Sequence, residues 1–72
     1  MAVDATLTLG FRDNNSAQRF SGWLYFNDYL DKSLFQNTVT VTLHSHGDRV
    51  LALEEARRRG GAIIEDEVND DY

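Results

Sequence analysis

Two histidines and one aspartate recur at every second position near the middle of the chain: His44, His46 and Asp48. Residues two apart in an extended strand project from the same face, so a strand through these positions would bring the three side chains together. Imidazole and carboxylate groups form a ligand set for zinc or nickel. A closed site still needs a fourth ligand, and the spacing no longer gathers the side chains if the strand ends near His44. We therefore keep the three residues as weak candidates for metal binding, and we expect no bound metal and no other cofactor.

Catalysis by side chains alone has little support in this sequence. Ser45 and His46 are neighbours, but nothing identifies an oriented base, an oxyanion hole or a pocket around them. The chain has no glycine-rich phosphate loop and no carboxylate pair in an apolar setting, and its acidic residues cluster toward the C-terminus in a segment expected to be solvated. The sequence predicts a protein that is not an enzyme.

The residues before the histidines predict a strand. From Thr38 to Leu43, valine and leucine alternate with threonine. This is the period-2 pattern of a strand with one buried face, and β-branched residues favour such a surface. Val39, Val41 and Leu43 should therefore point into the core.

A helix and a second strand are expected after the histidines. Gly47 breaks the first strand, and Asp48 stands where an N-cap side chain accepts the free amide hydrogens of a first helical turn. The helix should cover about 48–59 and end at Gly60, which can adopt the left-handed conformation. The apolar run at 62–64 fits a short buried strand. Two strands joined by such a helix should run parallel, often with another strand between them.

The N-terminal part begins with a second alternating segment. Apolar residues occupy every second position from Ala5 to Phe11, which predicts another strand. The residues at 12–18 include aspartate, asparagine and serine, whose short polar side chains favour turns. We expect a hairpin loop there.

The aromatic-rich segment that follows fits two patterns. Its apolar residues alternate as in a strand at 19–26, whereas the spacing of Trp23, Phe26 and Leu30 fits one face of a helix. The preceding loop and the aromatic content favour the strand. A short helix is then expected at about 28–35, with Asn37 ending it.

These elements predict one small α+β domain at 1–68, with a mixed sheet of three or four strands and one main helix packed on one face. The tail at 69–72 is expected to be acidic and flexible, because like charges repel and little apolar area is available for burial. A chain of 72 residues buries only about 60% of the surface that its unfolded form exposes. Self-association into a homo-oligomer, or a partner, would supply further burial.

The composition limits which classes of partner and which cellular compartment we expect for this protein. The formal net charge is −5 and cysteine is absent, so disulfides and thiolate metal sites are excluded. An acidic chain is a poor direct ligand for DNA or RNA, because affinity for phosphate comes largely from clustered lysine and arginine. No apolar run reaches the length of a membrane span, and the N-terminal residues lack the basic and hydrophobic regions of an export signal. We expect a cytoplasmic protein that binds neither nucleic acid nor membrane directly.

The aromatic and acidic side chains of this sequence favour partner binding as its function. One interpretation of the aromatic rings is that they fill the small core. The other interpretation is that the rings bind a partner, because the predicted strand would turn Trp23 and Tyr25 outward together. Tryptophan and tyrosine are enriched at binding hot spots. The acidic C-terminal segment would steer the domain to a basic surface on another protein. The candidate partner-binding residues are Trp23, Tyr25, Tyr29, Glu65, Asp66, Glu67, Asp70 and Asp71.

One family resemblance covers less than half of the chain. The segment VTVTLHSHGDRVLALEEARRRGGAIIEDEV resembles the small linker domain of cyanobacterial phycobilisomes, with Gly60 and Gly61 followed by an apolar strand as the matching part. The resemblance implies a domain that joins protein assemblies without doing chemistry. His44 and Ser45 depart from the proline and tyrosine that are usual in those linkers.

The sequence therefore predicts a small, acidic, non-enzymatic module for protein–protein interaction. Its expected role is that of an inhibitor or adaptor of the kind encoded by phages and mobile elements, acting on a host protein or on a nucleic-acid enzyme. The alternative is a structural linker in a light-harvesting assembly.

Overall fold

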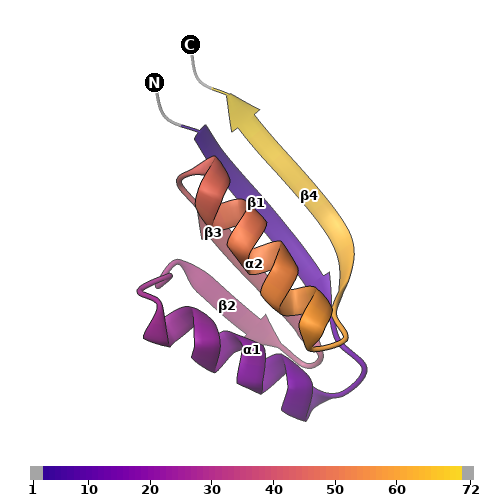
Figure 1. The fold of residues 1–72 in the computed structure, drawn as a ribbon. Coiled ribbons are helices and arrows are strands. Elements are labelled where there is room, and N and C mark those ends of the chain that lie inside the picture. The colour runs from indigo at the N-terminus through magenta and orange to yellow at the C-terminus, as the bar shows by residue number, and fades with distance from the viewer. Residues whose placement is uncertain (1–2, 71–72) are drawn as a thin grey trace.

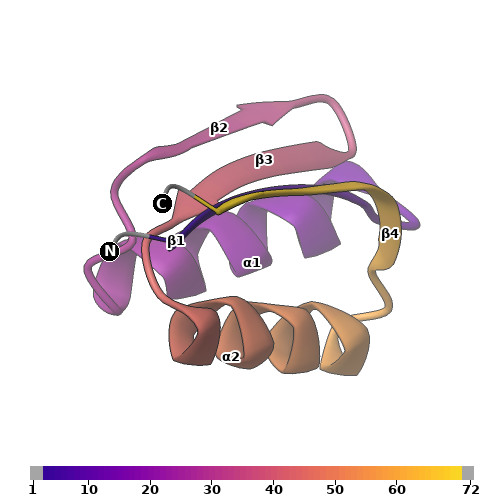
Figure 2. The same cartoon turned by 90° about the horizontal axis from the view of Figure 1, so that it is seen from above.

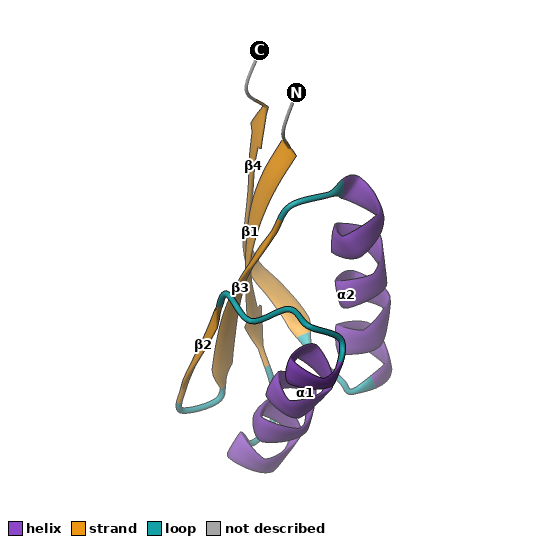
Figure 3. Ribbon diagram, turned by 90° about the vertical axis from the view of Figure 1, so that its left-hand side faces the viewer, coloured by secondary structure: helices purple, strands orange, loops and turns teal. Residues whose placement is uncertain are grey.

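The computed structural model describes residues 3–70, which form a four-stranded sheet and two helices. In chain order the elements are β1 (Val3–Gly10), α1 (Asn14–Phe26), β2 (Lys32–Phe35), β3 (Thr38–Leu43), α2 (His46–Arg58) and β4 (Ala62–Asp70) (Figure 1). The strand order is β2-β3-β1-β4, and every neighbouring pair is antiparallel. Both helices lie on the same face of the sheet (Figures 2 and 3). This is the split β-α-β arrangement of ferredoxin-like folds.

The predicted α+β class is confirmed, and the predicted mixed sheet is antiparallel instead. Strands β3 and β4, joined by α2, do run parallel to each other, as the sequence predicts. They are not neighbours, however, because β1 lies between them and is antiparallel to both. The intervening strand therefore removes every parallel pair from the sheet.

The core lies between the sheet and the two helices. Strand β3 alternates as predicted, with Val39, Val41 and Leu43 buried. Ala5, Leu7 and Leu9 of β1 are buried in the same way. Helix α1 contributes Phe20, which is fully buried and whose ring centroid lies 5.2 Å from that of Phe11. The buried residues are Ala5, Leu7, Leu9, Phe11, Ala17, Phe20, Leu24, Val39, Val41, Leu43, Ala52 and Ala56.

Helix α1 occupies the region where the sequence predicted a hairpin loop and a strand, and both of those predictions are wrong. Asp13 is an N-cap residue, and its carboxylate accepts a hydrogen bond of 2.7 Å from the backbone amide of Ser16. This hydrogen bond is the main reason that the pKa of Asp13 is lowered. Ala17, Phe20 and Leu24 then recur at the three- and four-residue spacing of a helix face, and all three are buried.

The end of α1 is formed without glycine. Asp28 takes a positive φ of 64°, and the amide of Tyr29 donates to the carbonyl of Leu24 at 2.9 Å. The amide of Asp28 also donates to the carbonyl of Tyr25 at 3.1 Å. These two bonds make a Schellman motif, in which glycine usually holds the left-handed position.

Strand β2 replaces the short helix predicted at about 28–35, and that prediction is also wrong. Lys32–Phe35 pairs with β3, and Gln36 and Asn37 connect the two strands as a two-residue hairpin. Asn37 therefore lies in a turn and ends no helix. Gln36 has a φ of 54°, and its carbonyl accepts a hydrogen bond of 2.7 Å from the side-chain amide of Asn14.

Helix α2 begins slightly earlier than predicted. The predicted N-cap was Asp48, but Ser45 holds that position and accepts a hydrogen bond of 3.1 Å from the amide of Asp48. Strand β3 ends at Leu43, so Gly47 lies inside the helix. At the other end Gly60 has a φ of 80°, as its predicted role requires. The amide of Gly61 donates to the carbonyl of Ala56 at 2.7 Å, which completes a second Schellman motif.

The prediction of a short buried strand at 62–64 is wrong in length and burial, because β4 is a longer edge strand in which Ile63 and Ile64 are 50% and 61% exposed. The strand continues through Asp70, past Val68, after which the sequence predicted a flexible tail. It pairs with β1 along its length, with a bulge opposite Thr8 and Leu9. The final part of the predicted tail, including Asp71, lies outside the described residues. Within residues 3–70, neither helix has the length and apolar character needed to cross a lipid bilayer.

Candidate functional site: the uncovered face of the sheet

The sheet face opposite the helices carries a tract of threonines. Residues paired across an antiparallel sheet point to the same side, and Thr8 lies between Thr40 of β3 and Glu65 of β4. Thr6 lies in the same way between Thr42 and Glu67, and the hydroxyls of Thr6 and Thr42 are 3.4 Å apart. The outward-facing threonines are Thr6, Thr8, Thr38, Thr40 and Thr42. We call this surface the open face.

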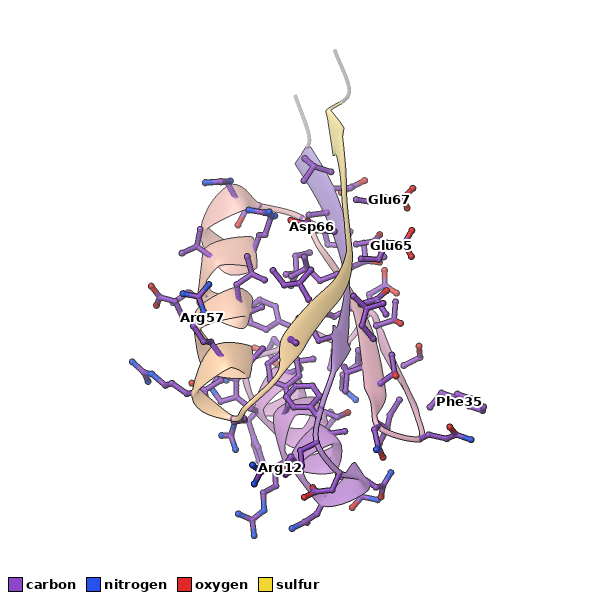
Figure 4. The ribbon with its side chains drawn as sticks, turned by 90° about the vertical axis from the view of Figure 1, so that its right-hand side faces the viewer. Arg12, Phe35, Arg57, Glu65, Asp66 and Glu67 are labelled. Atoms are coloured by element: carbon purple, nitrogen blue, oxygen red, sulfur yellow. The ribbon has the colours of Figure 1, made fainter. Side chains whose placement is uncertain are left out.

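Acidic side chains occupy the β4 side of the open face. Glu65 and Glu67 are exposed and point away from the helices (Figure 4). Neither forms an ion pair with any residue in the described part of the chain. They are two residues apart on one strand, so their backbone positions are separated by about 7 Å. The open face thus carries two neighbouring carboxylates with no compensating charge.

Basic side chains are segregated from this surface. Arg19 lies on α1, three arginines lie on α2, and Arg59 caps that helix. Lys32 pairs with Val41 and therefore takes the helix side of the sheet. Arg12 follows β1 in the connection to α1. No lysine or arginine within the paired segments of the four strands projects from the open face, so its field is acidic.

Two apolar side chains lie at one end of the open face. Phe35 of β2 pairs with Thr38, is 73% exposed and points away from the helices (Figure 4). Ile64, at the bulge in β4, is 61% exposed. Its Cδ1 atom lies 2.9 Å from the position that a Cβ of Gly10 would occupy, so glycine leaves room for the isoleucine. An exposed aromatic and an exposed isoleucine give this end of the face an apolar character.

Asp66 behaves differently from its two neighbours. It pairs with Leu7, so its side chain turns to the helix side. There it forms an ion pair with Arg49 of α2, and the Nε atom of that arginine donates to Asp66 at 3.3 Å. The structure therefore separates the predicted acidic residues, with Glu65 and Glu67 on the open face and Asp66 joining β4 to α2. The backbone of Asp70 belongs to β4.

The predicted aromatic residues are also separated. Trp23 is half-buried, and its ring lies 5.9 Å from those of Phe20 and Tyr29. Tyr25 is 61% exposed and contacts Phe26 at a ring separation of 6.0 Å. Because the segment is a helix, Trp23 packs against the core and does not form an outward-facing pair with Tyr25. Tyr25 and Phe26 instead form a small exposed aromatic pair at the end of α1.

The three weak metal candidates do not converge. The Nδ1 atom of His44 lies 2.7 Å from the carboxylate of Asp4, Asp48 accepts a hydrogen bond of 2.8 Å from the Tyr29 hydroxyl, and His46 begins α2. Among residues 3–70 no three histidine, cysteine or acidic side chains are arranged to hold a metal ion. The strand ends at Leu43, so the period-2 spacing does not extend through this cluster.

A hollow of about 530 Å³ lies beside these residues, between the α1–β2 connection and the start of α2. Tyr29, Leu30, His44 and Asp48 are among the residues that line it. Partial burial, followed by the hydrogen bond to Asp48, raises the pKa of Tyr29 above its ordinary value. A tyrosine is already protonated at neutral pH at its ordinary pKa of about 10, so the Tyr29 hydroxyl donates to Asp48 throughout this range.

The contact between His44 and Asp4 leads to a pH-dependent prediction. The hydrogen bond to Asp4 is the largest cause of the raised pKa of His44. Asp4→Asn should lower the pKa of His44 toward the ordinary value of about 6.5. The pKa is measured from the pH dependence of the chemical shifts of the imidazole protons. A histidine whose pKa is higher in the folded state contributes stability below its unfolded pKa. That stability is lost as the pH rises through the folded-state pKa.

The control for this titration is Glu54→Gln, which removes an exposed carboxylate from α2. This variant should leave the pKa of His44 as it is in the unmodified protein. An equal shift in both variants would show that net charge, and not the contact with Asp4, sets the pKa of His44.

Sequence reasoning missed the open face as a surface. The alternation that places Val39 and Val41 inside also places the intervening threonines outside. The sequence therefore did contain the signal for the threonine part of the open face. Phe35 and Ile64 were not recognised, because the first lies in an unpredicted strand and the second at a bulge. The segregation of charge follows from the register of β4, which the sequence pattern does not specify.

Comparison of the chain with protein families, curated proteins and solved structures finds no match. Fold alone does not assign a function, because ferredoxin-like folds support many. The geometry and charge of the open face therefore carry the functional interpretation.

Proposed function

We propose that this protein is a non-enzymatic binding module whose open face engages a basic surface on another protein. The observation that carries the proposal is the pair Glu65 and Glu67, exposed and without ion-pair partners among the described residues. Complementary charge accelerates encounter and disfavours partners of the wrong charge. Threonine hydroxyls beside the two carboxylates add hydrogen-bonding groups, and Phe35 adds an apolar contact at the edge.

The partner class follows from the same features. A nucleic acid would be repelled by this face, because binding to phosphate requires clustered basic side chains. A protein that itself binds nucleic acid has the required basic surface, and the open face would compete for it by charge mimicry. This corresponds to an inhibitor or adaptor acting on a host protein, of the kind that phages and mobile elements encode.

The proposal is tested by reversing charge on the two layers of the molecule. Glu65→Lys changes the open face, and Glu54→Lys makes the same charge change on α2, at another exposed position. In affinity capture from the lysate of the source or host cell, Glu65→Lys should weaken binding of the partner about tenfold, equivalent to about 1.4 kcal/mol. Glu54→Lys should bind as the unmodified protein does, and moderate salt should weaken binding in both, since screening reduces interactions between exposed charges.

Two results would contradict the proposal. One is equal retention of a stoichiometric partner by the two charge-reversed proteins. The other is capture that does not change with salt. Tyr25→Ala is a third variant, which tests the contribution of an exposed aromatic side chain to partner capture and leaves the core intact. Replacing the half-buried Trp23 would also disturb folding.

A structural linker in a light-harvesting assembly is the second candidate. The observation that favours it is the order of elements in the C-terminal half, where a strand and a helix are followed by Gly60, Gly61 and the final strand. This candidate predicts association with pigmented proteins of the source cell. It is excluded if the source makes none.

A further inference from the structure

We propose that β4 binds an extended basic segment of the partner as an additional strand of the sheet. This inference rests on the proposed function and specifies how the partner is held. An extended chain added to a sheet edge gains affinity from main-chain hydrogen bonds and specificity from alternate side chains.

Strand β4 is the long free edge of the sheet. The order β2-β3-β1-β4 leaves two edges, and β2 has only four residues, whereas β4 has nine. The bulge in β4 lies at Ile64, so the segment from Glu65 to Asp70 continues the regular ladder with β1. Short strands, bulges and charged side chains protect an edge from pairing. This segment is neither short nor bulged, so its protection is its acidic side chains, which disfavour any added strand that lacks basic residues.

The backbone groups that face the free edge can be assigned from the register. The amide of Phe11 donates to the carbonyl of Asn37, on the β3 side, at 2.9 Å. Peptide groups alternate in direction along a strand, so the even-numbered residues of β1 face β4. Thr8 and Thr6 pair with Glu65 and Glu67, so those two glutamates direct their backbone groups to β1.

The alternate residues of β4 direct their backbone groups away from the sheet. The residues with outward-directed backbone groups are Asp66, Val68 and Asp70. Their amides and carbonyls form an edge long enough to pair with a short extended peptide. Val68 is 48% exposed, on the helix side of the strand. Helix α2 reaches this side of β4 through Arg49, which pairs with Asp66, and Val68 beyond that contact remains accessible.

Charge determines which strand can be added. Antiparallel pairing of β4 with a second copy would bring Glu65 and Glu67 of both chains to neighbouring strands of one face, about 5 Å apart across the pair. Like charges placed opposite each other destabilise such a pair. A segment with lysine or arginine at every second position would instead place its cations beside the two glutamates. Its intervening apolar residues would lie beside Val68, so the favoured occupant is an alternating basic and apolar segment.

The experiment uses a short synthetic peptide of alternating lysine and valine and the full protein. Val68→Pro removes an amide that faces the free edge and spares the ladder with β1, since proline is tolerated on an edge strand where its nitrogen faces solvent. Val68→Thr keeps the amide and is the matched control. Peptide affinity should fall about tenfold or more in the proline variant, the equivalent of one or two net backbone hydrogen bonds. It should change less than about twofold in the threonine variant.

Amide hydrogen exchange gives a second readout that needs no substitution. Peptide binding should slow exchange at the amides of Asp66 and Val68 in the unmodified protein. Salt-sensitive binding that Glu65→Lys weakens, with no protection at these amides and no effect of Val68→Pro, would overturn strand addition and leave the acidic-face proposal standing. Binding that is unaffected by Glu65→Lys would instead count against the proposed function. Absence of peptide binding to the unmodified protein would also overturn strand addition.

Discussion

Phe20→Ala should lower the free energy of unfolding by about 3–5 kcal/mol. The ring is fully buried between the sheet and α1, with Phe11 at 5.2 Å and Trp23 at 5.9 Å between ring centroids. Its removal would leave a cavity that these neighbouring rings can fill only in part. A domain of 72 residues has a total stability of about 4–11 kcal/mol at the usual 0.05–0.15 kcal/mol per residue. The variant should therefore lose a large fraction of its stability, measured by urea denaturation followed by tryptophan fluorescence or circular dichroism.

Phe26→Ala is the matched control, because it removes the same side chain from the end of the same helix. Phe26 is 85% exposed, so its loss should change the free energy of unfolding by less than about 0.5 kcal/mol. The pair also separates helix from strand in this segment. A strand at 19–26 would bury both phenylalanines on one face, so comparable losses in the two variants would contradict the helix.

The segment from β3 to the end of α2 was predictable because its signals are local. Alternation in β3 specifies which residues are buried, a polar cap precedes α2, and Gly60 holds the left-handed position that ends the helix. Each signal lies within a few residues of the structure it specifies. The cap itself was misplaced, because Ser45 and Asp48 are both good capping residues and the sequence does not choose between them.

The central segment was not predictable from the same rules, because its signals support competing structures. Asp13 and the polar residues after it are typical of a turn, and here Asp13 caps a helix. Gly22 lies inside that helix, where glycine is unfavourable, and Asp28 ends it in the position that glycine usually holds. The hairpin before β3 has Gln36 at a positive φ, where glycine or asparagine is the usual signal.

The open face depends on register, which sequence alone did not supply. The acidic run from Glu65 leads into a flexible tail that the sequence predicts at 69–72, because like charges disfavour compact structure. In the fold, pairing with β1 and the contact between Asp66 and Arg49 hold this run in the sheet. Only that strand assignment divides the run into outward-facing Glu65 and Glu67 and inward-facing Asp66.

Gly61→Ala should destabilise the fold by about 1–3 kcal/mol, the usual effect of overpacking a well-packed site. A Cβ at this position would lie 2.7 Å from Cε2 of Phe11 and 3.0 Å from the backbone carbonyl oxygen of Ala56. The ring is buried and the carbonyl belongs to the end of α2, so neither can move without cost. The same carbonyl accepts the hydrogen bond from the Gly61 amide. Added bulk should therefore disturb both the core and the helix end, measured as a lower midpoint of urea denaturation.

Gly22→Ala is the control with the opposite expected sign. Gly22 lies inside α1, and apart from its chain neighbours and the adjacent helix backbone no heavy atom lies within 4 Å of the position that its Cβ would take. Alanine should therefore add helix propensity without a clash and stabilise the protein by about 0.5–1 kcal/mol. Stabilisation at Gly22 together with loss at Gly61 would support an uncrowded position inside an element for the first residue and the contact with Phe11 for the second. Loss of stability at Gly22 would contradict the open space that the structure shows around its Cβ position.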